Sequence, residues 1–184
     1  MITELDLGRF RTVRIWEGEL PPACFTSAAV ISAAVPASGN KATRSMPSKF
    51  CVEYKAHLGG RISYGLLGST FETSQDPLLS IEVVTKEVGW EIYSNTMYKG
   101  NDPILVGLPE VFGQGVLQST LSFFGRTQSP IARGKLSFIC AAFSEVGSSE
   151  DVFDRLSHIN SFYHSSVAAY RQAPSTKELL AILD

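Results

Sequence analysis

The residues that could do chemistry are few and scattered in this sequence of 184 residues. Its three histidines are His57, His158 and His164, and the last two are six residues apart, which places them on different faces of a helix. No cluster of cysteines or acids completes a ligand set around them. We therefore predict no metal site and expect the three histidines to lie on the surface.

The cysteines and serines show no catalytic pattern. Cys24, Cys51 and Cys140 form neither a Cys-x-x-Cys pair nor an even set for disulfides, and the last two lie in apolar runs, so they are predicted to be reduced core thiols. Residues 64–72 (YGLLGSTFE) lack the lysine and the spacing of a phosphate-binding loop. No Gly-x-Ser-x-Gly nucleophile turn is present. We predict no cofactor and no enzymatic activity.

Composition favours one domain that spans residues 1–184. The sequence is 44% hydrophobic, its net charge is −2 and its pI is about 5.9, so any contact with a nucleic acid must be local. Residues 20–40 contain no charged residue and superficially resemble a membrane span or an export signal. Their three prolines and many Ala and Ser residues argue against both. We expect a cytoplasmic protein without membrane contact.

Alternation and turn residues predict a series of strands. Residues 20–35 fit a buried strand or a short helix, and residues 36–49 are rich in breakers and are predicted to form a mobile loop. Gly59-Gly60 favours a tight hairpin between two of the strands. The predicted strands are residues 10–16, 49–58, 61–72, 78–88, 90–97 and 134–143.

Helical signals follow the strands. Pro109 is expected to open a helix that Gly125 closes, with Gly113 and Gly115 tolerated because they pack closely on a sheet. A terminal helix is predicted over residues 175–184 after Pro174. This order predicts an α+β fold, with helices on one face of a mainly antiparallel sheet of four or more strands.

Residues 143–156 (FSEVGSSEDVFDRL) raise the main functional question. Ser148 and Ser149 are good helix N-cap residues, and Glu150 and Asp151 suit the positive end of a helix. Val152, Leu156, Ile159 and Tyr163 then form one apolar stripe. A helix start explains these residues by itself, and a binding role for the same turn stays open.

Two separated stretches resemble a known family. GGRISYG (residues 59–65) and VGSSEDVF (residues 146–153) are similar to two stretches of domain IV of elongation factor G, a bacterial translational GTPase. GLPEVFGQGVLQSTLSFF (residues 107–124) and the strand after it appear in the same order as in that family. The resemblance covers residues 59–163. It implies a ribosomal protein S5 domain 2-like fold, which is a four-stranded sheet backed by helices with a left-handed βαβ crossover.

The resemblance also implies a site. In the family the two stretches lie at a tip that touches ribosomal RNA, with an arginine as the natural phosphate contact. The positions that match the family are Gly60, Arg61, Tyr64, Val146, Ser148, Ser149 and Glu150.

Several features depart from the family. Ser144 and Glu145 replace a His-Asp pair that includes the functionally important tip histidine, Gly147 replaces an aspartate, and the GTPase domain is absent. We therefore do not expect translocation by the family's usual mechanism. Two functions stay open, namely a non-catalytic module for ribosomal or other structured RNA, and a module for a protein partner or for homo-oligomers.

Overall fold

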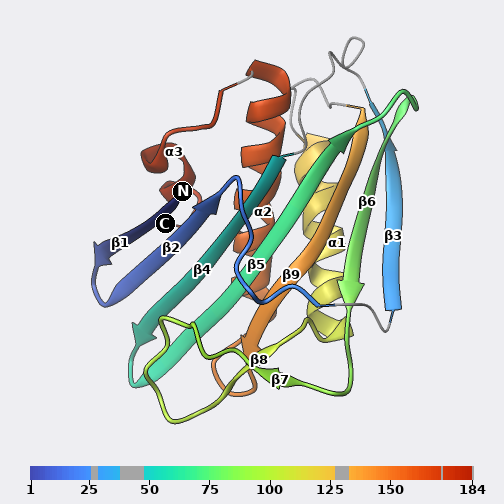
Figure 1. The fold of residues 1–184 in the computed structure, drawn as a ribbon. Helices are drawn as coiled ribbons and strands as arrows, with labels where there is room; N and C mark the ends of the chain where they lie inside the picture. Colours follow the sequence, from blue (N-terminus) through green and yellow to red (C-terminus); the bar gives the residue numbers. More distant parts are fainter. Residues whose placement is uncertain (26–28, 38–47, 127–132, 171, 184) are drawn as a thin grey trace.

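A single sheet dominates the computed structural model (Figure 1), which describes residues 1–25, 29–37, 48–126, 133–170 and 172–183. Seven strands follow the order β1-β2-β4-β5-β9-β6-β3, and the short β7 and β8 extend the end of β9. All neighbouring pairs are antiparallel except β6 and β9. The strands are β1 (Ile2–Gly8), β2 (Arg11–Glu17), β3 (Ala29–Pro36), β4 (Ser48–Leu58), β5 (Arg61–Thr73), β6 (Leu78–Thr85), β7 (Glu91–Ile92), β8 (Ile104–Val106) and β9 (Gly134–Ser144).

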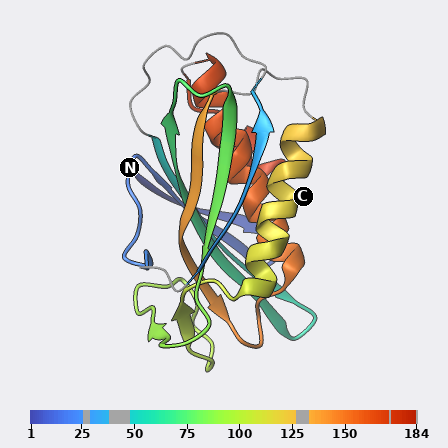
Figure 2. The ribbon, with the colours of Figure 1, turned by 90° about the vertical axis from the view of Figure 1, so that its right-hand side faces the viewer.

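Three helices lie on one side of this sheet. They are α1 (Glu110–Arg126), α2 (Glu150–Tyr170) and the short α3 (Thr176–Leu180). Figures 1 and 2 show α1 and α2 stacked against the same face of the strands. The predicted α+β class, with helices on one face of a mostly antiparallel sheet, is confirmed. No described helix is both long and apolar enough to cross a membrane.

The parallel pair β6 and β9 has an unusual connection. The chain between these strands passes through β7, β8 and α1. In Figure 1 both strands point downwards, α1 lies behind them, and the chain moves from β6 on the right to β9 on the left. This path winds in the left-handed sense, whereas about 98% of such crossovers are right-handed.

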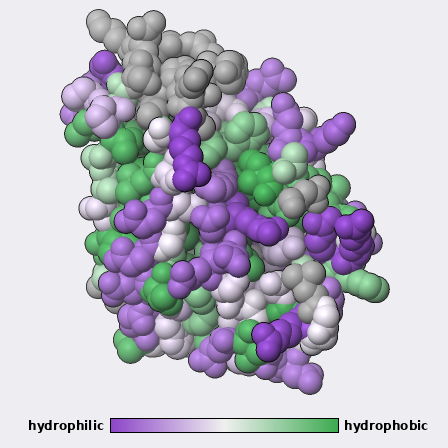
Figure 3. All heavy atoms as spheres, turned by 180° about the vertical axis from the view of Figure 1, so that it is seen from behind, coloured by the Kyte–Doolittle hydropathy of each residue, from purple (hydrophilic) through white to green (hydrophobic). Residues whose placement is uncertain are grey.

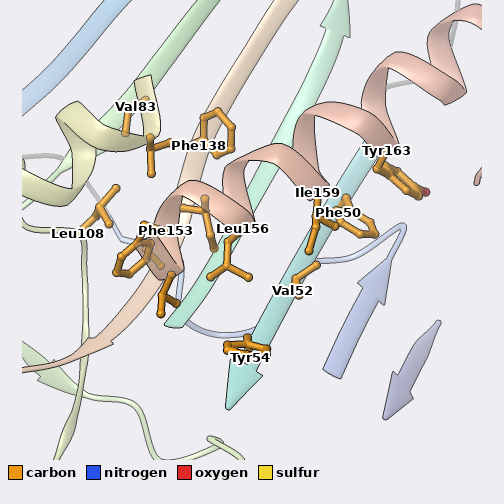
Figure 4. Packing of buried hydrophobic residues seen from close by; sticks show 14 of the residues in the cluster. Phe50, Val52, Tyr54, Val83, Leu108, Phe138, Phe153, Leu156, Ile159 and Tyr163 are labelled. Carbon is orange, nitrogen blue, oxygen red and sulfur yellow. The ribbon is translucent and has the colours of Figure 1, made fainter. Parts of the chain in front are cut away.

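Alternation along the central strands builds the main core. Phe50, Val52 and Tyr54 of β4 face the helices, where they meet the apolar stripe of α2 (Figure 4). The rings of Phe50 and Tyr163 stack with their centroids 4.0 Å apart. The predicted stripe is confirmed, since Val152, Leu156, Ile159 and Tyr163 are all buried. Full burial of each large apolar side chain contributes roughly 1.5–3 kcal/mol.

Two glycines of α1 lie in different surroundings. Gly113 is buried against β6, and a Cβ atom there would lie 2.5 Å from Cγ2 of Thr85. Gly115 has no such neighbour within 4 Å. The predicted close packing is therefore confirmed for Gly113 and wrong for Gly115. The helix itself begins at Glu110, directly after Pro109.

Most predicted elements appear with small shifts. Gly59 and Gly60, with φ angles of 56° and 86°, form the expected hairpin turn between β4 and β5. Ser175 caps α3 through a complete capping box. The first prediction to fail is the strand over residues 90–97, because β7 comprises only two residues and the following segment turns towards β4.

The N-terminal half contains further differences. Strands β1 and β8 were not predicted from the sequence. Residues 20–35 were predicted as a buried strand or a short helix, but the only regular element that the structure describes among them is β3, which forms one edge of the sheet and is largely exposed. The predicted loop over residues 36–49 lies mostly outside the described residues, and β4 already begins at Ser48.

The other face of the sheet carries a second, smaller core. The segment from β7 to β8 covers it, together with residues 20–25. Its buried members are Trp16, Ala23, Cys51, Tyr64, Leu66, Tyr93, Tyr98, Ile104, Val106, Cys140 and Ala142. On the helix-covered side, hydrophilic residues separate the hydrophobic ones into small areas (Figure 3).

Candidate functional site

The two stretches that resemble the family meet at one end of the sheet. The hairpin between β4 and β5 and the turn between β9 and α2 lie together at the lower end in Figure 1. The backbone N–H of Tyr64 donates to the carbonyl oxygen of Gly147 at 2.9 Å. The hydroxyl of Ser148 donates to the carbonyl oxygen of Tyr64 at 2.7 Å, across 84 residues of sequence. We call these two turns together the tip.

Serine hydroxyls hold the second turn of the tip in shape. Ser148 Oγ also accepts a hydrogen bond from the backbone N–H of Ser144 at 2.9 Å. Ser144 Oγ in turn accepts from the N–H groups of Gly147, at 2.9 Å, and Val146, at 3.3 Å. The Ser148 hydroxyl was predicted as a ligand contact, but the structure uses it inside the protein. Its role in the tip is to position the turn.

Gly147 is required by the contact between the turns. A Cβ atom at this position would lie 2.5 Å from the carbonyl oxygen of Ile62, so no larger residue fits without a backbone shift. Gly65, which lies on β5 like Ile62, is equally confined, because a Cβ atom there would lie 2.6 Å from Cγ1 of Val152. A glycine at position 147 thus permits the close packing of the two turns.

Tyr64 lies inside the protein. Its side chain is fully buried and its hydroxyl donates to Glu53 Oε1 at 2.9 Å. It was predicted as a contact residue, yet its ring does not reach the surface. Tyr64 therefore contributes through its backbone, which pairs with the other turn.

The exposed part of the tip is small and of mixed charge. Gly60, Arg61, Ser149 and Glu150 are all exposed, and the side chain of Val146 is 76% exposed. Glu145 and Asp151 are exposed as well. Because side chains alternate along a strand, Arg61 lies on the same side of β5 as Gly65, which is the side of α2. The tip thus offers one guanidinium on the helix-covered side of β5, together with several carboxylates.

A buried ionic network lies behind the tip, and the sequence analysis did not identify it. The carboxylate of Glu53, fully buried, accepts hydrogen bonds from Tyr64, from the hydroxyl of Thr96 at 2.8 Å and from the N–H of Met97 at 2.8 Å. Arg14 Nη1 lies 3.3 Å from the other carboxylate oxygen. Burial raises the pKa of Glu53, while these donors act in the opposite direction. The network fastens the loop after β7 onto the sheet.

His164 is buried, so the prediction of three surface histidines is wrong for this residue. Ser69 Oγ donates to Asn160 Oδ1 at 2.6 Å and must therefore accept from His164 Nε2, 2.9 Å away. His164 Nδ1 then accepts from the hydroxyl of Ser48 at 2.8 Å. A Ser–His pair can be a nucleophile and its base, but burial lowers the pKa of His164 to about 3. Such an imidazole is a poor general base at neutral pH.

The cysteines converge on the second core. Cys51 and Cys140 are buried, as predicted. The prediction of a core thiol is wrong for Cys24, which is exposed and pairs through its backbone with Cys140 in an isolated β-bridge. Burial raises the pKa of the Cys51 and Cys140 thiols, and a hydrogen bond with Cys140 is the main cause that raises the pKa of Cys24. All three are free thiols that stay protonated at neutral pH, which makes them weak nucleophiles.

Neither a group of metal ligands nor a similar known protein indicates which reaction or ligand the protein could serve. Within the described ranges, no group of three or more His, Cys, Asp or Glu side chains could hold a metal ion. No protein-family model and no curated protein matches the sequence. The geometry of the tip is therefore the main guide to function.

Proposed function

We propose that this protein is a stand-alone, non-catalytic binding module that recognises structured RNA, with ribosomal RNA in the cytoplasm as the first candidate. The observation that carries the proposal is the pairing of the two stretches that resemble domain IV of elongation factor G. They are far apart in sequence, yet two hydrogen bonds of 2.9 and 2.7 Å join them at one end of the sheet.

The path of the chain supports the same kinship. The left-handed connection from β6 through α1 to β9 is rare among proteins, and the family's ribosomal protein S5 domain 2-like fold has one. The strands β4, β5, β9 and β6 lie side by side in that order, backed by α1 and α2. The remaining strands extend this sheet at both edges.

The chemistry of the tip suits a small contact with phosphate. Arg61 supplies the positive charge, and the first N–H groups of α2 have no partner within the helix and can bind an anion. The neighbouring acids Glu145, Glu150 and Asp151 limit how much phosphate the tip attracts. We therefore expect weak binding, with about one phosphate neutralised by Arg61.

Equilibrium binding to a structured RNA hairpin tests the proposal. Fluorescence anisotropy at 50 and 200 mM salt should show that affinity falls about threefold for each phosphate neutralised. Arg61→Ala should weaken binding and reduce this salt dependence. The matched control is Arg126→Ala, which removes an exposed arginine at the far end of α1. Binding that is absent, or equal in Arg61→Ala and the control, contradicts the proposal.

A second candidate, self-association, has support from β3. This strand, Ala29–Pro36, forms one of the two edges of the described sheet, carries no charged residue, and its Val30 is 50% exposed. Edge strands are usually protected by charges, and an unprotected one can pair with a second copy. Light scattering should then detect a dimer that Ala34→Lys dissociates, whereas Gln114→Lys on α1 should not. A monomer at all concentrations rejects this candidate.

A further inference from the structure

The turn between β1 and β2 has a backbone that its residues do not favour. Gly8, Arg9 and Phe10 have φ angles of 70°, 51° and 63°. Glycine adopts such angles readily, but two consecutive larger residues are strained there, most of all a bulky aromatic one. The turn is held by a hydrogen bond from Gly8 N–H to Asp6 Oδ1 at 2.8 Å and another from His57 N–H to the carbonyl oxygen of Phe10 at 3.1 Å.

This strain presents Phe10 to solvent. The side chain is 78% exposed and does not belong to either core. A large ring that is exposed in a strained turn contributes little to folding. Backbone strain of this kind occurs frequently at sites that bind ligands.

Phe10 borders a cavity of about 410 Å³ at the end of the sheet that also carries the tip. The cavity opens on the sheet face opposite the helices, because Lys55 and His57 alternate with the core residues of β4. Its volume lies within the range of small-molecule sites. Its side chains come from Asp6, Arg9, Phe10, Thr12, Lys55 and His57.

The cavity combines one aromatic ring with an excess of basic groups. Arg9 and Lys55 carry positive charges and His57 adds an imidazole, against the single carboxylate of Asp6. One oxygen of that carboxylate already accepts the Gly8 N–H. Thr12 adds a hydroxyl that can donate and accept.

We propose that this cavity binds one nucleotide, with the base stacked on Phe10 and the phosphate held by Arg9 and Lys55. Every base has a face that stacks on an aromatic ring, and Arg and Lys bind phosphate through charge-assisted hydrogen bonds. The nucleotide can be free or part of a single strand. The site uses none of the tip residues, so this proposal and the RNA-binding role of the tip fail independently.

Titration with three probes tests the site and separates the sources of the nucleotide. The probes are AMP, an RNA tetranucleotide of adenosine and inorganic phosphate. We expect saturable binding of AMP, of the tetranucleotide or of both, and at least tenfold weaker binding of phosphate. AMP alone indicates a free nucleotide, and tighter binding of the tetranucleotide indicates a strand. If neither binds, or if phosphate binds equally well, the proposal is wrong.

Phe10→Gly is the decisive variant, since glycine suits the positive φ angle and keeps the turn. It should weaken nucleotide binding at least fivefold, which is the low end for loss of one stacked base. Its melting temperature should not fall below that of the wild type, so weaker binding cannot be due to unfolding. Lys55→Gln should weaken binding and reduce its salt dependence, whereas Arg126→Gln, which removes an exposed charge outside both proposed sites, should change neither. Unchanged affinity in Phe10→Gly overturns the proposal.

Discussion

Replacing His164 with glutamine should change how the stability of the protein depends on pH. Burial holds the pKa of His164 near 3, whereas an unfolded chain titrates near 6.5. Between these values the unfolded state binds more protons than the folded state, so the free energy of unfolding falls as the pH falls. The stability that the neutral imidazole contributes is complete above about pH 6.5 and is lost progressively towards pH 3.

The size of this loss of stability follows from the difference between the folded and the unfolded pKa of His164. One proton changes the free energy of unfolding by about 1.4 kcal/mol per pH unit. From pH 7 to pH 5, the loss due to His164 alone amounts to about 2 kcal/mol, since the unfolded imidazole titrates only below pH 6.5. Glutamine at this position does not titrate and can keep a hydrogen bond with Ser48 or Ser69.

Urea unfolding at pH 7, 6 and 5, followed by tryptophan fluorescence, measures this difference. The stability advantage of the wild type over His164→Gln should shrink by about 2 kcal/mol between pH 7 and pH 5. His57→Gln makes the same replacement at an exposed position and should follow the wild type. A wild-type advantage that stays constant with pH would mean that His164 titrates alike in the folded and unfolded chains, which contradicts a neutral, buried imidazole.

Two further pairs of variants and one single variant test the packing, the ionic network and the strained turn. In urea unfolding, Gly113→Ala should lower the free energy of unfolding by about 1–3 kcal/mol, because the added methyl group overpacks the contact with β6. Gly115→Ala should raise the free energy of unfolding by about 0.5–1 kcal/mol, because alanine is the better helix former. Equal effects of the two variants would contradict close packing at Gly113 alone. Glu53→Ala should lower the free energy of unfolding by about 3–5 kcal/mol, because it leaves the buried donors of Tyr64 and Met97 and the partly buried guanidinium of Arg14 without this partner. Glu4→Ala removes a 54% exposed carboxylate from the same guanidinium and should cost at most about 1 kcal/mol. Phe10→Gly should raise the free energy of unfolding by about 1 kcal/mol, and a decrease would contradict the strain.

Local patterns predicted the parts of the fold that local forces determine. The hairpin at Gly59-Gly60 follows from two glycines that accept positive φ, and the stripe of α2 follows from helical periodicity. Strand β1 could also have been found, because Leu5 and Leu7 alternate with Glu4 and Asp6.

Contacts between residues that are far apart in sequence explain why His164 and Tyr64 were wrongly predicted to be exposed. His164 resembles a surface residue of an amphipathic helix until β4 and β5 bring Ser48 and Ser69 to its ring. Tyr64 resembles an exposed aromatic of a loop motif, but it is buried because its hydroxyl meets Glu53. Neither partner is visible from local periodicity.

The candidate site was only partly predictable. The two turns of the tip were identified as residues 59–65 and 146–153, and the structure brings them together through Tyr64 and Gly147. The roles of single residues were less accessible, since hydroxyls such as that of Ser148 serve the turn itself. The cavity beside Phe10 escaped the sequence analysis, because its residues come from two hairpins and show no motif.

Backbone amide NMR during titration with a structured RNA shows whether the two turns of the tip bind RNA together. Chemical shifts should change first and most strongly in residues 59–63 and 145–151, which form these two turns. These changes should weaken between 50 and 200 mM salt and become smaller in Arg61→Ala. Shift changes confined to β3, or to only one of the two turns, or a spectrum that RNA leaves unchanged, would contradict RNA binding by the two turns together.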